Sequence, residues 1–332
     1  MAWLPREPRE IPLIHHLDSK SRALRAGVVG TGAFGRHHAA KYASGDGVNL
    51  AAIADPSAET RRAMEERFGI ETYADWKDML GKVDLVSICS PAVTHAHIVR
   101  AFLNAGAHVL VEKPFATTLR EADQLIDLAE RKNVVLTVGH QERFVFARSG
   151  LMEMTETPLE ISCWRMGPWT GRGADVSAVL DLMIHDIDLM HRLVPGAVAE
   201  VDAFARAERG RHPDEVSAAI SFENGTLARL HASRVAHQRK RGMQLVYVDG
   251  IVEIDFMTRE IRNTTRRSLG EISFDDPLSE SVASFVRSVR GEDPTFVRPE
   301  EARLALETAL LIEQAARAPA RSPAIEKIAA TA

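Results

Sequence analysis

The sequence has few cysteines and no long apolar run. Its 2 cysteines, Cys89 and Cys163, both lie in apolar, strand-like surroundings, which indicates a reducing compartment and no disulfide framework. No window approaches the roughly 18 consecutive apolar residues of a transmembrane helix. The N-terminal stretch carries prolines and charges where a signal peptide needs an apolar core. These absences predict a cytoplasmic protein that has no membrane partner.

An excess of positive charge is also absent. The formal net charge is −5, so neither nucleic acid nor an anionic membrane is indicated as a partner. The basic segment 238–241 is too short and isolated to form a nucleic-acid patch. Instead, 45% hydrophobic and 26% charged residues are typical of a globular protein with substantial cores, and 332 residues predict two domains.

The first half alternates short apolar runs with longer amphipathic segments. Continuous apolar runs that alternate with helical segments predict parallel strands covered on both faces by helices. We therefore expect residues 25–147 to form a doubly wound α/β domain of the Rossmann type, preceded by a polar arm over residues 1–24. Gly69, Asn133 and a Thr118–Glu121 capping box are expected at helix ends.

The second half predicts an α+β domain over residues 148–332. Successive strand candidates, with the turn dipeptides Asn224-Gly225 and Asp249-Gly250 between some of them, favour an open and mostly antiparallel sheet. A helix around Asp181 interrupts the series, and a long helix from Pro299 follows it. One face of such a sheet needs cover, so we expect a homodimer or homotetramer formed through this sheet.

The stretch "VVGTGAFGRHH" contains a phosphate-binding fingerprint. Gly30, Gly32 and Gly35 have the G-x-G-x-x-G spacing between a predicted strand and a predicted helix. That context favours a dinucleotide loop, which Thr31, Ala33 and Phe34 complete, over a glycine-rich turn without a ligand. The amides that begin the helix would face the phosphates.

The acidic partner of this loop is Asp55, at the end of the next predicted strand, about 25 residues after Gly30. A carboxylate there accepts both ribose hydroxyls of the adenosine and repels a 2′-phosphate, so NAD is the expected cofactor. Arg61 and Arg62, about two turns into the following helix, keep NADP open as the alternative.

An apolar helix with misplaced charges, "LDLMIHDIDLM", is the second candidate site. Asp181 and His185 are four residues apart and thus share a helical face, and such a polar stripe is typical of a helix that lines a polar cavity. Imidazole suits proton transfer at neutral pH, so His185 is the expected proton acceptor and Asp181 the residue that contacts substrate or orients it. Asp186 is expected to be structural, and Asp188 to belong to either a substrate rim or a salt bridge.

Two other interpretations of this helix are possible. A single histidine on an apolar helix is commonly a satisfied core residue, but the pairing of His185 with Asp181 argues against that here. The i,i+4 spacing also suits two metal ligands. No third ligand stands at a characteristic spacing, so we expect no metal.

Three further stretches resemble one family. "SPAVTHAHIVRAFLNAGAHVLVEKPFATTLREADQL", "VGHQERF" and "DLMIHDIDL" follow the glycine loop in the order found in the glucose-fructose oxidoreductase / inositol dehydrogenase / rhizopine-catabolism (Gfo/Idh/MocA) family. The resemblance spans roughly residues 27–254 and implies a dinucleotide-binding domain followed by an α+β domain with an open sheet. It also implies hydride transfer between nicotinamide and a carbinol of a sugar, cyclitol or nucleotide sugar.

The resemblance also implies roles for residues in the first half. It makes Lys113 catalytic, and it places Ser90, Pro91 and His95 beside the cofactor together with Glu112. For His95, a plain helix-start role is the alternative. The position of Lys113 at the end of an apolar strand independently favours this role, because that edge of a doubly wound sheet faces the ligand crevice. A lysine ammonium there would stabilise developing alkoxide charge, whereas the simpler alternative is a solvated strand-end lysine.

The segment "RMGPWTGRGAD" is the expected substrate loop. Arg143, Arg165 and Arg172 could bind phosphates, and Trp169 could stack on a base or sugar, which favours a nucleotide sugar over inositol or a free sugar. Ordinary surface arginine is the alternative for each. The surrounding stretches resemble the family branch that oxidises the 3-hydroxyl of UDP-N-acetylglucosamine or its uronate.

Two other functions within the same fold remain open. One is a non-catalytic dinucleotide-binding regulator, which would not need Lys113, Asp181 and His185 together. The other is a relative that cleaves carbon–halogen or ether bonds or reduces biliverdin. The N-terminal arm is longer than is usual for the family, which affects the expected assembly.

Overall fold

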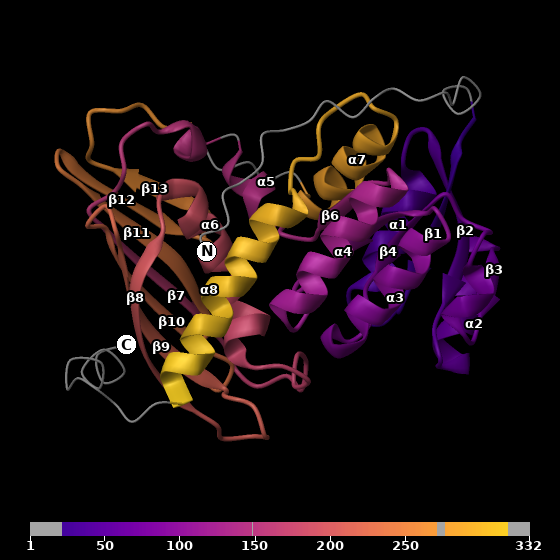
Figure 1. Ribbon diagram of the computed structural model, residues 1–332, viewed down its shortest axis with the longest axis horizontal. Helices are drawn as coiled ribbons and strands as arrows, with labels where there is room; N and C mark the ends of the chain where they lie inside the picture. The colour runs from indigo at the N-terminus through magenta and orange to yellow at the C-terminus, as the bar shows by residue number, and fades with distance from the viewer. Residues whose placement is uncertain (1–21, 148, 271–275, 318–332) are drawn as a thin grey trace. The chain divides into compact units, whose positions relative to one another are not determined.

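The computed structural model describes residues 22–147, 149–270 and 276–317 (Figure 1). The chain forms two compact units. The first holds the residues up to Gly139 and Leu278–Arg303, and the second holds His140–Pro277 and the residues from Leu304 onward. The chain thus leaves the first unit and later returns to it, which a single division after residue 147 does not describe. Most of the expected arm, residues 1–21, lies outside the described residues.

The sheet of the first unit is parallel throughout, with strand order β3-β2-β1-β4-β5-β6. Its strands are β1 (Leu24–Val29), β2 (Val48–Ala54), β3 (Glu71–Tyr73), β4 (Leu85–Ile88), β5 (His108–Val111) and β6 (Leu136–Val138). This is the predicted doubly wound sheet. The order reverses between β1 and β4, and ligands of such sheets bind at that switch point. Sequence reasoning missed β3, whose three residues contain no apolar run.

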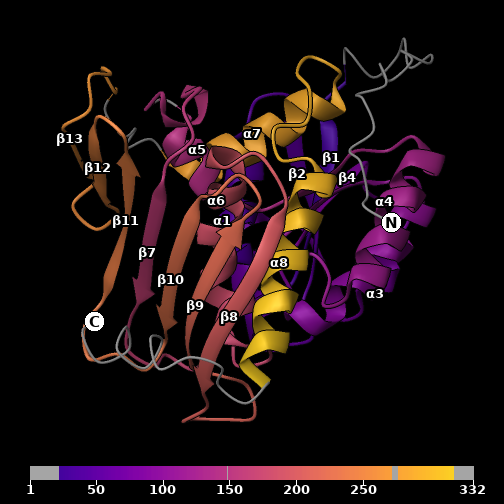
Figure 2. The same cartoon turned by 60° about the vertical axis from the view of Figure 1, so that its left-hand side comes forward.

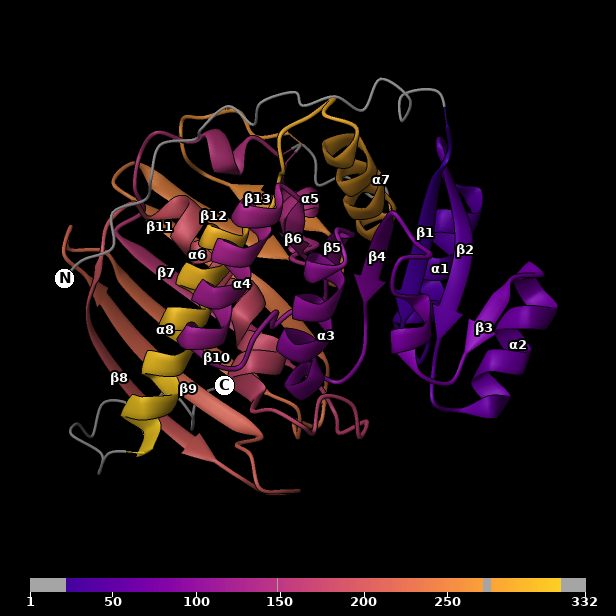
Figure 3. The same cartoon turned by 45° about the vertical axis from the view of Figure 1, so that its right-hand side comes forward.

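Helices connect these strands, and α3 and α4 lie side by side in Figure 3. The helical segments of this unit are α1 (Gly35–Ser44), α2 (Ala58–Phe68), η1 (Trp76–Met79), α3 (Ala92–Asn104), α4 (Leu119–Lys132), α7 (Pro277–Val289) and the start of α8 (Pro299–Arg317). The expected helix ends are confirmed. Gly69 and Asn133 adopt the left-handed conformation, and the Thr118 hydroxyl accepts from the Glu121 amide at 3.2 Å.

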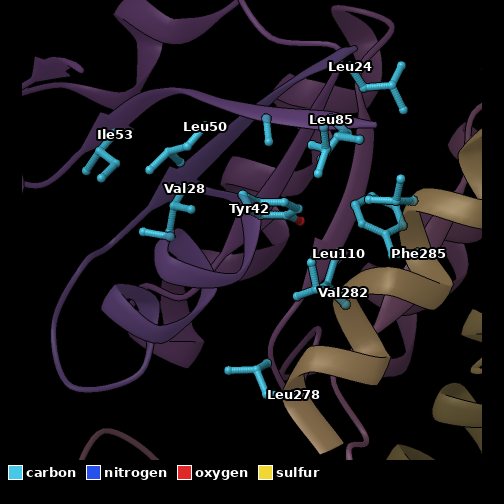
Figure 4. Close-up of a cluster of buried hydrophobic side chains, with 14 of the residues drawn as sticks. Leu24, Val28, Tyr42, Leu50, Ile53, Leu85, Leu110, Leu278, Val282 and Phe285 are labelled. Carbon is cyan, nitrogen blue, oxygen red and sulfur yellow. The ribbon is translucent and has the colours of Figure 1, made fainter. Parts of the chain in front are cut away.

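Helix α7 completes the core of the first unit. Its side chains Leu278, Val282, Phe285 and Val286 belong to the same buried cluster as Tyr42 of α1 (Figure 4). Burying each such apolar side chain stabilises the fold by about 1.5–3 kcal/mol. The C-terminal part of the chain therefore supplies a structural layer to the N-terminal domain, and the sequence did not predict α7.

The second unit contains a seven-stranded sheet in the order β13-β12-β11-β7-β10-β9-β8, seen side by side in Figure 2. Its strands are β7 (Glu160–Met166), β8 (Val198–Arg206), β9 (Glu215–Phe222), β10 (Leu227–Ser233), β11 (Lys240–Tyr247), β12 (Gly250–Asp255) and β13 (Glu260–Asn263). Only the β7–β10 pair is parallel, so the predicted mostly antiparallel sheet is confirmed.

The helical segments of the second unit include the one that interrupts its strands. They are α5 (Glu142–Phe146), η2 (Leu151–Glu153), η3 (Val179–Met183), α6 (Ile184–Leu193) and the remainder of α8. Segment η3 is a π-helical turn that runs directly into α6 and packs on β10. None of the helices described, from residue 22 to residue 317, is long and apolar enough to cross a membrane.

Candidate active site

The glycine loop has the shape that a bound pyrophosphate requires. Gly30 has a φ of +80°, and a Cβ there would lie 2.8 Å from the Ser90 amide nitrogen. A Cβ on Gly35 would overlap the Gly30 carbonyl, so α1 can begin this close to β1 only with glycine. No atom lies within 4 Å of a Cβ built on Gly32, which leaves open space for a ligand to approach the backbone. The loop therefore fits a dinucleotide.

Asp55 follows β2 and holds this loop in place. Its carboxylate accepts hydrogen bonds from the amides of Thr31 at 2.8 Å and Ser57 at 2.9 Å, and the residue is 8% exposed. The Thr31 hydroxyl also donates to this carboxylate, at 3.3 Å. A carboxylate has about four lone-pair sites, so roughly one remains open to a ribose hydroxyl in this conformation. Arg61 lies in the first turn of α2 rather than two turns in, and it donates to the carbonyls of Asp55 and Pro56.

The residues after β4 are connected by hydrogen bonds. Ser90 and Pro91 lead into α3, where the buried His95 ring bridges two carbonyl oxygens, those of Ser90 and Pro114, at 2.8 Å each. His95 therefore ties the end of β4 to the residue after Lys113. This is a bracing role that the sequence pattern did not specify.

Lys113 lies just beyond β5, at the carboxyl edge of the parallel sheet, and its bond to Pro114 is cis. The preceding residue, Glu112, takes part in a buried hydrogen-bond network. The His38 ring contacts the Glu112 carboxylate at 3.0 Å and the Ser87 hydroxyl at 3.0 Å, and Ser87 also bonds the Tyr42 hydroxyl at 2.7 Å. The helix that follows the glycine loop is thus joined directly to the strand that bears Lys113. Sequence reasoning missed His38.

In the second unit, the polar residues of the apolar helix differ in their exposure to solvent. Between Val179 and Met190 only Asp181, Leu182 and His185 retain partial exposure. Asp181 lies in the π-helical turn, a local geometry that occurs frequently at functional sites. The His185 ring is 6.3 Å from the His140 ring in an edge-on arrangement. Asp181 and His185 are thus the polar residues of this segment that reach the surface of the second unit in part.

The other two carboxylates of this helix are buried in ion pairs. Asp188 accepts two hydrogen bonds from Arg143, at 2.6 and 2.7 Å, and Asp186 is paired with Arg165 at 2.7 Å. Arg165 also donates to Glu142 at 2.8 Å. Of the two alternatives left open for Asp188, the structure shows the salt bridge, and Asp186 has the structural role expected of it.

These pairs revise the interpretation of two arginines. Arg143 and Arg165 are each 2% exposed, and buried carboxylates already neutralise their charge. Burial alone would raise the pKa of Asp188, but His140 and Arg143 outweigh it and hold that pKa below its usual range. The two arginines therefore support the helix from within and do not present a phosphate site, contrary to the prediction from sequence. Trp169 is half-buried and Arg172 is exposed.

A fourth residue of α6, His191, predicts how stability depends on pH. Burial lowers its pKa to about 4, against a smaller opposing effect of Asp188. The unfolded chain therefore binds a proton between about pH 6.5 and pH 4 that the native protein does not bind, and the free energy of unfolding falls as pH falls through that window. The loss is at most about 3 kcal/mol.

The variant His191→Gln tests this, since glutamine can keep the 2.7 Å bond to the Thr308 hydroxyl. Urea unfolding of both proteins at pH 7 and pH 4.5 should show a smaller loss of stability in the variant. His231, whose pKa burial also lowers, titrates in both proteins and serves as the common background. An equal loss in the two proteins would rule out this role for His191.

Throughout the described ranges, no group of three or more His, Cys, Asp or Glu side chains could hold a metal ion. Both cysteines are free thiols, and burial raises their pKa values well above the usual range.

Two family models match this chain. One, described as an oxidoreductase family with an NAD-binding Rossmann fold, matches residues 24–140, and the Gfo/Idh/MocA C-terminal domain matches residues 155–253. The chain belongs to the Gfo/Idh/MocA oxidoreductase family. It is accordingly a nicotinamide-dependent dehydrogenase that acts on CH–OH groups, and its first unit is the family's NAD-binding fold.

Individual relatives within the Gfo/Idh/MocA family differ in substrate. UDP-N-acetylglucosamine 3-dehydrogenase of Acidithiobacillus ferrooxidans is 30% identical over 309 residues, which cover 89% of this chain and 98% of the relative. Its solved structure matches with a TM-score of 0.82 and 31% identity, covering 88% and 97% of the two chains. Myo-inositol 2-dehydrogenase of Thermotoga maritima is 28% identical, covering 85% and 93%.

A more distant solved structure shares the family fold. The WlbA dehydrogenase from Bordetella pertussis, solved in complex with NADH and UDP-GlcNAcA, has a TM-score of 0.80 at 20% identity and covers 89% of this chain and 96% of its own. At that identity the likeness concerns the fold alone.

Proposed function

We propose that this protein is an NAD-dependent dehydrogenase of a UDP-sugar, with the 3-hydroxyl of UDP-N-acetylglucosamine or a related UDP-sugar as its substrate. The observation that carries the proposal is the partial exposure of the polar residues Asp181 and His185 in a segment, 179–190, whose other polar residues are buried. The relative that is 30% identical over nearly its whole length supports the choice of substrate.

Three side chains are assigned to the chemistry. Lys113 donates a hydrogen bond to the reacting oxygen and stabilises its developing negative charge. His185 accepts the hydroxyl proton, and Asp181 positions the sugar or the imidazole. A bound NAD would supply the hydride acceptor for the carbinol carbon. The residues of the glycine loop and Asp55 would hold it, with Ser90, Pro91, His95 and Glu112 supporting its nicotinamide half.

Exposed arginines favour a nucleotide sugar over inositol. The loops after β7, β8 and β10 meet at one edge of the second sheet, because the register pairs Met166 with Ser233 and Ser233 with Glu215. These loops carry Arg172, Arg211 and Arg239, which are exposed and have no ion-pair partner among the residues that the structure describes. Arginine is well suited to bind phosphate, so the edge fits a diphosphate, which a cyclitol lacks.

The substrate assignment is tested by measuring NAD reduction with UDP-N-acetylglucosamine, its uronate, inositols and free hexoses. We expect the highest kcat/KM with a UDP-sugar. A higher kcat/KM with an inositol would replace the proposed substrate by the alternative. Tight NADH binding without turnover of any of them would favour a regulator.

The preference for NAD is assigned to Asp55. The variant Asp55→Asn keeps one side-chain oxygen that can accept from the Thr31 or the Ser57 amide, but it removes the negative charge. We expect KM for NAD to rise by about tenfold and NADP to be used relatively better, since the repulsion of a 2′-phosphate is lost. Initial rates with both cofactors measure this, and the exposed Asp78 provides the control Asp78→Asn. An unchanged ratio of NAD to NADP use would show that Asp55 does not set the preference.

Two expectations from the sequence remain predictions. One is the cytoplasmic location, and the other is a homodimer or homotetramer formed through the sheet of the second unit.

A further inference from the structure

The loop between β7 and η3, residues 167–178, is fastened at both ends by backbone hydrogen bonds. The Gly167 amide donates to the Ser233 carbonyl at 2.8 Å, and the Ala178 amide donates to the Pro213 carbonyl at 2.8 Å. This segment, called the substrate loop below, carries Trp169 and Arg172. Its ends are thereby held by the last residue of β10 and by the β8–β9 connection, and the residues between them have other contacts.

Arg234 supplies that support from beneath the loop. It is 6% exposed, and its Nη1 donates to the carbonyls of Gly173 at 2.5 Å and Val176 at 3.0 Å. Its guanidinium carbon lies 5.2 Å from the centroid of the Trp169 ring, which is within cation–π range. One buried side chain therefore contacts three separate positions along the substrate loop.

Asp214 holds Arg234 in this orientation. Its Oδ1 accepts from Arg234 Nε at 2.8 Å, and its Oδ2 accepts from the amides of Glu208 and Arg209 at 2.7 and 2.6 Å. Asp214 is fully buried. Backbone amides of the turn between β8 and β9 hold its carboxylate independently of the guanidinium. The orientation of the Arg234 guanidinium is thus set by a carboxylate that is itself hydrogen-bonded to the backbone.

The substrate loop in turn constrains Asp181. Gly173 has a φ of +66°, and a Cβ built on it would overlap the Asp181 carboxylate. The Gly173 backbone thus lies directly against the carboxylate that is expected to meet the substrate. Arg234 holds the Gly173 carbonyl, and the position of that carbonyl determines the space left for the Asp181 carboxylate.

We propose that Arg234, oriented by Asp214, is the positioning residue that fixes the substrate loop and the Asp181 carboxylate for binding of the sugar nucleotide. In this role Arg234 acts through the loop residues Gly173, Val176 and Trp169 that it contacts. The choice of ligand rests on the proposed function, whereas the ordering of the loop does not. Preorganised supporting contacts of this kind determine how well a site is formed before its ligand arrives.

The kinetic test compares Arg234→Met and Arg234→Lys with a control on the same strand. Arg229→Met is the control, because Arg229 belongs to β10 but pairs with the half-exposed Glu160. We expect Arg234→Met to raise KM for the UDP-sugar by about 10- to 100-fold with unchanged NADH dissociation, and the lysine variant to recover part of the loss. A wild-type KM in Arg234→Met would overturn the proposal.

A second readout does not depend on activity. Trypsin can cleave after Arg172 only when the substrate loop opens, so Arg234→Met and Asp214→Asn should increase cleavage there by about tenfold while cleavage at the exposed Arg266 stays constant. Cleavage at the wild-type rate in both variants overturns the proposal. If the wild-type protein oxidises no UDP-sugar but cleavage still rises, the proposed function fails and the role of Arg234 stands.

Discussion

Replacing Lys113 with methionine should lower kcat by about 10²- to 10³-fold while leaving NADH binding unchanged. Methionine keeps the length of the side chain but removes the ammonium that stabilises the developing alkoxide, and losing one such donor typically costs this much. Lys113 follows β5 directly, and His38 and His95 brace the residues on either side of it. The substitution should therefore leave the surrounding backbone in place.

The measurement is steady-state kinetics with the best UDP-sugar, together with an NADH titration by fluorescence. Lys77→Met is a matched control, because Lys77 is an exposed lysine of the same unit. Lys113→Arg should recover little activity, since a guanidinium fork cannot replace a compact ammonium at one oxygen. A kcat within about twofold of wild type in Lys113→Met would show that Lys113 is an ordinary solvated lysine.

Replacing His185 with alanine should lower kcat by about 10²- to 10⁴-fold, the usual contribution of a positioned general base. The pH profile gives the sharper result. When an imidazole accepts the hydroxyl proton during oxidation of an alcohol by NAD, the rate rises with pH in the neutral range, and the variant should lose that rise. A merely structural histidine would change the stability of α6 and leave the shape of the profile intact.

His212→Gln provides the control, because His212 is exposed in the β8–β9 connection of the same unit. The variant Asp181→Asn should fall between wild type and His185→Ala if Asp181 positions the imidazole or the sugar. A pH profile of His185→Ala that keeps the wild-type rise would assign the proton to another group. The neighbouring His140 would be the first to examine.

The first sheet was predictable because its determinants are local. The strands of the parallel sheet are short continuous apolar runs, and Gly69, Asn133 and Thr118 act through the backbone of their own helix ends. The glycine loop was equally clear, since a strand, three glycines and a helix are adjacent in sequence. The short β3 was missed because its three residues show no apolar pattern, and it is recognised as a strand only by its pairing with β2.

The arrangement of the buried arginines was not predictable in the same way. Arg143 and Arg165 lie beside a presumed pocket in sequence, and an arginine near a pocket is equally consistent with a phosphate ligand and a buried ion pair. Only tertiary structure pairs them with Asp188 and Asp186, 45 and 21 residues away. Arg234 and Asp214 lie 20 residues apart on different connections, and no spacing rule links them.

The helix at Asp181 shows a more subtle limit. A regular spacing of 3.6 residues per turn puts Asp181 and His185 on one face, and both are indeed the partly exposed polar residues of the segment. The π-helical turn from Val179 to Met183 was not foreseen, because apolar periodicity does not distinguish it from an α-helix over one turn.

The return of the chain to its first unit has a consequence for synthesis on the ribosome. Strands β1 to β6 are complete once residue 138 has been made, yet the face that packs on Phe285 and Val286 stays uncovered until α7 emerges. At about 5–20 residues per second, that delay lasts roughly 7–30 seconds. The nascent N-terminal sheet therefore exposes apolar surface while the whole second sheet is translated, and a chaperone that shields it would act during this interval.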